Sequence, residues 1–169
     1  MPPVVYGNGA ETTPAELAEF YARLHHPLQP TPAHIERMLA NSAVAVTARA
    51  DDGRLIGLAR GISDGLRGYL TECKLDPAFQ GPGAVTRTDG RVEHDTGGIA
   101  GEMARRVLEK MFADGVLRVD VLAWGTEVDF VEELGFRRSG GLVGLTLVPT
   151  DWASRRNAAS SRAAGGWTI

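Results

Sequence analysis

The spacing of apolar residues near the start of the chain predicts a pair of short helices. Two sets of apolar residues recur at intervals of about three and four positions, which places each set on one helical face. Each set follows a Thr-Pro pair, Thr13-Pro14 or Thr31-Pro32, in which Thr can cap the helix and Pro suits its first turn. The sets are Leu17, Phe20, Tyr21 and Leu24, and Ile35, Met38 and Leu39. We therefore expect a helical pair that ends near Asn41.

The pattern then changes from helical to extended. Residues 44–49 alternate between the two faces of a strand, and extended structure resumes in residues 55–60. The intervening Asp51-Asp52-Gly53 is typical of a tight turn, so these segments predict an antiparallel hairpin. Tyr69 to Leu75 predicts a third strand, which stops at Pro77 because proline cannot donate to the ladder.

The second half of the chain predicts a helix, a strand, another helix and a last strand. A helical stripe of apolar residues ends at Asp114-Gly115. The mostly apolar run from Val116 to Trp124 suits a strand in the interior of a sheet. Thr126 can cap one more helix, and residues 138–148 predict a final strand or hairpin. The stripe consists of Ile99, Met103, Val107 and Met111, with Leu108 and Phe112 beside it.

A Gly-rich turn lies between the third strand and the long helix, and a polar insert divides it. The sequence Asp76 to Gly81 follows the strand, and after residues 82–96 the Gly-rich sequence resumes at Gly97 to Gly101. A helix N-terminus carries unpaired N–H groups and a partial positive charge, and glycines let a phosphate approach them closely. The junction therefore predicts a site for a phosphate-bearing ligand, although such a turn can also be only a tight connection.

The composition is that of a globular protein. Of the 169 residues, 43% are hydrophobic and 23% are charged. No apolar run approaches the roughly 20 residues that span a bilayer. The net charge of -3 and the pI near 5.8 argue against nucleic-acid binding. We therefore expect neither a membrane nor a nucleic acid as partner.

Cysteine usage and the start of the chain indicate a bacterial cytoplasm. Cys73 is the only cysteine, and Met1 to Tyr6 has neither the basic start nor the apolar core of a signal peptide. Arg, Ala and Gly abound whereas Lys74 and Lys110 are the only lysines, as expected from a GC-rich bacterial genome. No cluster of His, Cys and Asp has ligand spacing, so we expect no metal site.

The chain length favours one domain with a tail. One domain is the default at this size, and we assign it to residues 1–150. Beyond Pro149 the composition shifts to Ala, Ser and Arg, which predicts a poorly packed tail over residues 151–169. Trp152 and Trp167 would pack only by docking on the body or on a second subunit. A homodimer is therefore one arrangement that the sequence allows.

The order of elements resembles that of the GNAT superfamily of N-acetyltransferases, and two local motifs agree. Leu75-Asp76-Pro77-Ala78-Phe79 matches the end of the family strand that precedes the glycine turn. Phe130 to Phe136 matches the family's C-terminal helix motif except for a tyrosine, whose position Val131 takes. The hairpin over residues 51–60 is also similar to bacterial members. The resemblance covers roughly residues 13–148.

The family's glycine motif can be aligned with this chain in two ways. Both begin at Gln80-Gly81. The first continues directly to Gly83 and places Val85 at a position that needs a small residue. The second treats residues 82–96 as a mobile excursion and resumes at Gly98-Ile99-Ala100. We prefer the second because it supplies small residues where a phosphate must approach the helix.

The resemblance implies an α/β (α+β) fold and an acyltransferase activity. The expected GNAT-like domain has a mixed, mostly antiparallel central sheet, splayed in the middle near Leu75 and flanked by about four helices. The implied reaction moves an acetyl group from acetyl-CoA, the cosubstrate, directly to an amine of a small molecule or peptide in a ternary complex.

The resemblance also implies residues for the site. Glu72 matches an acidic position near the amine site and is the candidate general base, acting through water. A role as a solvated, outward-facing residue is the alternative. The strand backbone would pair with the pantetheine arm, and the glycine turn would hold the pyrophosphate. The implied cofactor-binding positions are Cys73, Lys74, Leu75, Gln80, Gly81, Gly98, Ile99, Ala100 and Gly101.

Three departures from the family pattern keep a second function open. Val131 replaces the tyrosine that commonly protonates the departing thiolate, and Trp124 stands where relatives often carry a cofactor-contacting Asn. The insert over residues 82–96 either folds over the cofactor or obstructs it. The alternative is a catalytically degenerate, GNAT-like module for CoA binding or protein interaction; use of another acyl-CoA or another acceptor also stays open.

Overall fold

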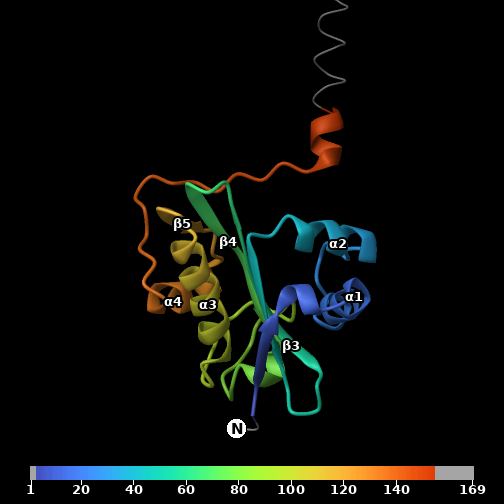
Figure 1. The fold of residues 1–169 in the computed structure, drawn as a ribbon. Coiled ribbons are helices and arrows are strands. Elements are labelled where there is room, and N and C mark those ends of the chain that lie inside the picture. The colour runs from blue at the N-terminus through green and yellow to red at the C-terminus, as the bar shows by residue number, and fades with distance from the viewer. Residues whose placement is uncertain (1–2, 155–169) are drawn as a thin grey trace, which may run out of the picture. The chain divides into compact units, whose positions relative to one another are not determined.

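A computed structural model describes residues 3–154 of the chain (Figure 1). The chain divides into two compact units, Met1–Arg137 and Arg138–Ile169. The first unit contains the sheet and its helices. The predicted tail is described only as far as residue 154, and Trp167 lies outside the described residues.

The first unit is built on a five-stranded sheet in the order β1-β2-β3-β4-β5. Neighbouring strands are antiparallel except for β4 and β5, which are parallel. This confirms the predicted mixed, mostly antiparallel sheet. The strands are β1 (Val5–Asn8), β2 (Val44–Arg49), β3 (Leu55–Ser63), β4 (Arg67–Leu75) and β5 (Arg118–Val121).

Helices cover both faces of the sheet. α1 (Pro14–Arg23) and α2 (Pro32–Ala40) pack on one face through a core that includes Leu17, Phe20 and Ile35. α3 (Ile99–Ala113) packs on the other face through Met103 and its neighbours, and α4 (Val128–Glu133) joins the same core. Figure 1 shows α3 and α4 on one side of the strands and α1 and α2 on the other. The capping and stripe signals thus predicted these helices correctly.

The predicted strand over residues 138–148 is wrong. None of these residues belongs to a strand, and the pairings of the described sheet do not include them. Apolar side chains such as Leu142, Val143 and Leu145 are exposed. Alternating apolar residues form a strand only where a partner edge pairs with them, and such a partner is not visible in sequence. Residues 149–154 are helical.

β4 and β5 separate halfway along β4. Their pairing ends at Leu70 and Val121, whereas β4 continues to Leu75. The register between β3 and β4 also shifts after Leu70, so that Thr71 is an extra residue in β4. The shift leaves Cys73 packed on the α3 side of the sheet and directs Glu72 to the α1 side. The predicted splay is therefore present, and it begins at Leu70 rather than near Leu75.

None of the helices within residues 3–154 is long and apolar enough to cross a membrane. The same residues contain no group of three or more His, Cys, Asp or Glu side chains that could hold a metal ion.

Candidate functional site

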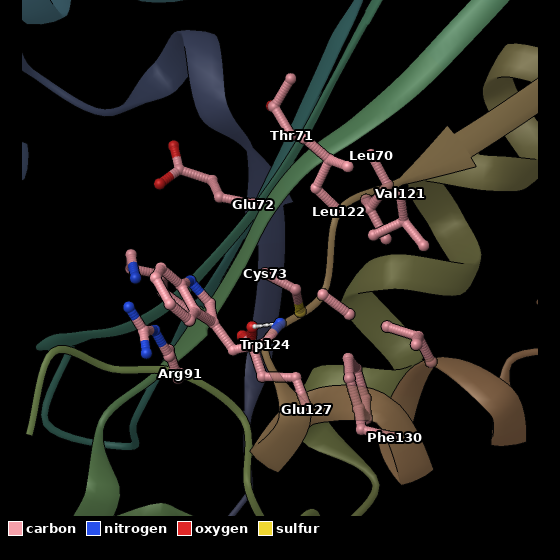
Figure 2. A pocket seen from close by; sticks show the side chains of 13 residues that line it. Leu70, Thr71, Glu72, Cys73, Arg91, Val121, Leu122, Trp124, Glu127 and Phe130 are labelled. Atoms are coloured by element: carbon pink, nitrogen blue, oxygen red, sulfur yellow. Dashed lines mark hydrogen bonds between the residues drawn. The ribbon is translucent and has the colours of Figure 1, made fainter. Parts of the chain in front are cut away.

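A cleft of about 100 Å³ lies where β4 and β5 separate. Residues 70–74 of β4 form one wall, and residues 121–124, which begin at the last paired residue of β5, form the other. Glu127, Phe130 and Val131 of the segment that enters α4 complete the lining, together with Arg91 from the insert (Figure 2). The cleft thus contains Glu72, which was predicted from sequence, and Arg91 and Glu127, which were not.

Glu72 lines the cleft, but its carboxylate is held by two neighbours. Tyr21 Oη donates to Oε1 of Glu72 at 2.7 Å, and Nε of Arg60 donates to the same oxygen at 3.0 Å. Burial, and then the Glu72 carboxylate, raise the pKa of Tyr21, so that its hydroxyl stays a donor. The side chains of Glu72 and Cys73 leave β4 on opposite sides (Figure 2). Glu72 is therefore a positioned side chain rather than a freely solvated one.

Cys73 connects β4 to the start of α3. Its Sγ donates to the carbonyl oxygen of Ala100 at 3.6 Å. Burial is the main cause that raises the pKa of the Cys73 thiol, so it stays protonated near neutral pH. The structure thus brings together two groups of predicted site residues, those of β4 and those of the glycine turn, but gives Cys73 no nucleophilic character.

Glu127 is a second carboxylate in the cleft. Its Oε2 accepts a hydrogen bond from the amide nitrogen of Trp124 at 3.1 Å (Figure 2). Burial raises the pKa of Glu127, whereas the Trp124 N–H and the charges of Lys74 and Arg91 oppose the rise. Because burial depends on how the segment after β5 folds back, no local sequence motif indicated this residue.

Replacing Glu127 with Gln is expected to raise the free energy of unfolding at pH 8 and to leave it nearly unchanged at pH 4. The raised pKa means that the fold disfavours the charged carboxylate. That penalty is absent when the group is protonated in both states, and it grows as pH rises through the ordinary pKa. Gln keeps the shape and can still accept from Trp124. Urea unfolding at both pH values measures the effect, and an equal gain at pH 4 would contradict it.

The first turn of α3 is capped by a carboxylate from the insert. The amide nitrogens of Ala100 and Gly101 donate to Oδ1 and Oδ2 of Asp95 at 3.0 and 2.7 Å. Gly98 precedes the helix in the left-handed region, with φ of 67°, and its amide donates to the carbonyl oxygen of Asp95. These donors thus bind an anionic group of the chain itself, as expected for a helix N-terminus. Ile99 is buried in the core.

The edge of β4 that faces away from β3 also binds the insert. The amide nitrogen of Leu75 donates to the carbonyl oxygen of Gly90 at 2.9 Å, and Lys74 pairs with Arg91 in an antiparallel bridge. Nζ of Lys74 donates to the carbonyl oxygen of Asp89 at 2.9 Å. The strand backbone that was expected to meet a pantetheine arm therefore meets residues 89–91 here.

The fully buried Gln80 holds the insert in this position. Its Nε2 donates to the carbonyl oxygens of Leu75 and Arg91 at 3.0 and 2.7 Å. Its Oε1 accepts from the amide nitrogens of Glu93 and His94 at 3.0 and 3.2 Å. The predicted mobile excursion thus folds back on the body because one buried amide side chain satisfies four backbone groups.

The two ends of the insert meet. The amide nitrogen of Thr96 donates to the carbonyl oxygen of Gln80 at 3.2 Å. Gly81 has φ of 106°, and a Cβ there would lie 2.2 Å from Oγ1 of Thr96. Only glycine suits this position, because both its backbone angle and its neighbour exclude a side chain. Residues 81–96 therefore form a closed loop, and their status as an insertion stays a prediction.

Comparisons with solved structures relate this fold to known acetyltransferases. A proposed acetyltransferase from Deinococcus radiodurans R1 is 26% identical, with a TM-score of 0.61 over 89% of this chain and 95% of that one. A GNAT-family acetyltransferase from Streptococcus pneumoniae TIGR4 is 15% identical, with a TM-score of 0.63 over 86% of this chain and 98% of that one. Aminoglycoside N-acetyltransferase AAC(6′)-Iy, in complex with CoA, is 16% identical to this chain. Its TM-score is 0.63, over 87% of this chain and 96% of that one.

The chain has the fold of the GNAT superfamily, which confirms the resemblance that its motifs indicated. The similar structures are acetyltransferases. No protein-family model matches the sequence, and no curated protein matches it.

Proposed function

We propose that this protein transfers an acetyl group from acetyl-CoA to an amine of a small molecule or peptide within one ternary complex. The observation that carries the proposal is the junction of the β4–β5 splay with the start of α3, where Cys73 contacts Ala100. An edge of strand backbone and a helix N-terminus converge there, and the two have the hydrogen-bonding groups that an amide-containing arm and a pyrophosphate need.

The donors in this chain fit acetyl-CoA. Ala100 and Gly101 already bind a carboxylate, so their N–H groups are directed to hold an anion, and Leu75 already donates to a backbone carbonyl oxygen, that of Gly90. We assign the pyrophosphate to the first turn of α3 and the pantetheine arm to the edge of β4. When bound, the thioester supplies the activated acetyl carbonyl. A backbone N–H of Cys73 to Leu75 aimed at its oxygen would contribute about 3 kcal/mol to transition-state stabilisation.

Glu72 is our candidate for the general base. Tyr21 and Arg60 fix its carboxylate beside the cleft. An ammonium group with a pKa of about 10 must lose a proton before it attacks, and a bridging water can carry that proton to Glu72.

Val131 takes the family position of the tyrosine that commonly protonates the leaving thiolate, and it is buried in the core that α3 and α4 share. A thiol with a pKa of about 8.5 is already a tolerable leaving group near neutral pH. Loss of an acid that typically contributes 10²–10⁴-fold slows the reaction without abolishing it. We therefore propose a slow transferase.

A small-molecule amine is the acceptor class that we favour. Solved aminoglycoside acetyltransferases are among the structures similar to this chain, one in complex with CoA and one in complex with sisomicin. The carboxylates of Glu72 and Glu127 in the cleft also suit a cationic acceptor.

A non-catalytic CoA-binding or protein-interaction module is the second candidate. The contacts of residues 89–95 with β4 and α3 favour its protein-interaction form, because they occupy the donors that acetyl-CoA would need.

Release of free thiol from acetyl-CoA with a panel of amines tests these functions, together with the shift in melting temperature caused by CoA. CoA at 100 times its Kd should add about 2.7 kcal/mol to stability. The transferase proposal predicts amine-dependent thiol release and a thermal shift. A shift without release would support the module, and the absence of both would reject CoA as a ligand.

A further inference from the structure

The inner part of the insert, residues 89–95, contacts both sets of donors that the proposed function assigns to acetyl-CoA. We call this segment the strap. Its first half pairs with the β4 edge at Leu75, and its last residue, Asp95, caps α3. A stretch of peptide groups that hydrogen-bonds to β4, followed by an anionic group, parallels the order of the amide-containing pantetheine arm and the pyrophosphate in CoA. The strap thus resembles the ligand in both position and chemistry.

The strap also fills the splay. Arg91 is only 8% exposed, and its guanidinium lies over the Trp124 ring with Cζ 3.9 Å from the centroid (Figure 2). Nε of Arg91 pairs with the buried Asp89 carboxylate at 3.1 Å, and Val92 is fully buried in the core. The space left between β4 and β5 is about 100 Å³, smaller than the 300–1,000 Å³ typical of small-molecule sites.

Exposed residues and glycines flank the strap. Its outer neighbours, residues 82–84 and 86–88, are exposed. Gly81 and Gly98 flank the insert, and both have positive φ values, 106° and 67°. Nothing lies within 4 Å of a Cβ built on Gly98. Glycines at both ends of the insert, each with positive φ, can absorb the backbone change that a hinged segment needs.

We propose that the strap is an autoinhibitory element that occupies the acyl-CoA site in the resting protein and must leave before CoA binds. This inference rests on the proposed function. The apparent affinity for CoA is then the intrinsic affinity reduced by the fraction of molecules whose strap is open. Substitutions that release the strap should tighten CoA binding, whereas a strap that folds over bound CoA would give the opposite result.

Two substitutions release different halves of the strap. Asp95→Ala frees the Ala100 and Gly101 amides and removes a carboxylate that would repel phosphate. Gly90→Ala displaces the half that pairs with β4, because φ is 78° and the new Cβ would lie 2.5 Å from Cδ1 of Leu24. Asp95→Ala leaves no buried charge without its partner. Gly90→Ala moves the Asp89 carbonyl oxygen away from Nζ of Lys74, so thermal unfolding of both variants is measured before the titrations to show that they fold.

Each substitution has a matched control elsewhere in the chain. Asp64 accepts hydrogen bonds from the amides of Leu66 and Arg67, so Asp64→Ala removes a similar carboxylate at the opposite end of β4. Gly53 has φ of 82° and no atom within 4 Å of an added Cβ, so Gly53→Ala introduces the same backbone strain without a clash. We expect both controls to bind CoA like the wild type.

The test is titration of each protein with CoA and with ADP, which carries the pyrophosphate but no pantetheine arm. Asp95→Ala should tighten the binding of both ligands about 10-fold. Gly90→Ala should tighten CoA binding by a similar factor and leave ADP binding unchanged, because ADP has no arm to pair with β4. A general change in stability would alter the affinities for CoA and ADP alike. Tighter CoA binding with unchanged ADP binding in Gly90→Ala therefore indicates release of a competing strap.

Three outcomes would overturn the proposal. Equal CoA affinity in all five proteins would show that the strap does not compete, while leaving CoA binding itself intact. Weaker CoA binding in Asp95→Ala and Gly90→Ala would show that the strap contributes to the bound complex. Absence of CoA binding in every protein would overturn the proposed function and this inference together.

A measurement on the wild type does not depend on the variants. Arg91 is buried in the resting protein, so trypsin should cleave after it slowly. The proposal predicts that CoA speeds this cleavage, and slower cleavage with CoA would contradict it.

Discussion

Replacing Glu72 with Gln is expected to lower the rate of acetyl transfer about 100-fold and to change CoA affinity little. Gln has the same shape and can still accept hydrogen bonds from Tyr21 and Arg60. It cannot take a proton from the ammonium group of the acceptor. Steady-state kinetics with acetyl-CoA and an amine identified in the panel measures kcat, and titration with CoA measures affinity.

Glu127→Gln is the matched control, because Glu127 is the second carboxylate that lines the cleft. We expect Glu127→Gln to keep kcat within a few-fold of the wild type, with any loss confined to the KM of the cationic acceptor. A large loss in Glu127→Gln together with normal turnover in Glu72→Gln would assign the base to Glu127 and reject the role proposed for Glu72.

The second large effect is expected at Gln80, where replacement by Leu should lower the free energy of unfolding by about 3 kcal/mol. The fully buried side chain satisfies two carbonyl oxygens and two amide nitrogens. Leu fills a similar volume but leaves these four groups without their partner. Urea unfolding measures the loss, and an unchanged m value would show that it arises in the folded state.

Thr86→Ala provides the comparison within the same insert. Thr86 is exposed, and its hydroxyl donates only to the Glu93 carboxylate. We expect Thr86→Ala to change the free energy of unfolding by less than about 0.5 kcal/mol. If Gln80→Leu lowers the free energy of unfolding no more than Thr86→Ala does, the hydrogen bonds of Gln80 do not hold the insert in place.

Local signals in the sequence were enough for most of the framework. Thr13 and Thr31 accept hydrogen bonds at the starts of α1 and α2, as their Thr-Pro pairs predicted. The turn at Asp51-Asp52-Gly53 joins β2 and β3 in an antiparallel hairpin. These features depend on neighbouring residues, so a single sequence contains the information that determines them.

Features that depend on distant partners were missed or wrong. β1 was not predicted, because Val5–Asn8 is short and gains its strand geometry from pairing with β2. Residues 138–148 have an apolar pattern but belong to no strand in the described part of the chain. The extra residue at Thr71, which sets the side of the sheet that Glu72 faces, has no local signal.

The candidate site was predicted in part. Sequence placed Glu72 at the splay, where it lines the cleft, but left open whether the insert covers the cofactor or obstructs it. The answer depends on long-range contacts of Gln80, Arg91 and Asp95, which no periodic pattern in the sequence indicates. The roles of the predicted cofactor-binding residues remain a proposal.

A crystal structure of the protein with CoA tests the central claim most directly. Our account predicts the pyrophosphate on the amide nitrogens of Gly98 to Gly101, the pantetheine arm along β4 at Leu75, and residues 89–95 displaced from both. A pyrophosphate bound to Gly83 to Val85, or CoA bound elsewhere with the strap still on β4 and α3, would contradict it.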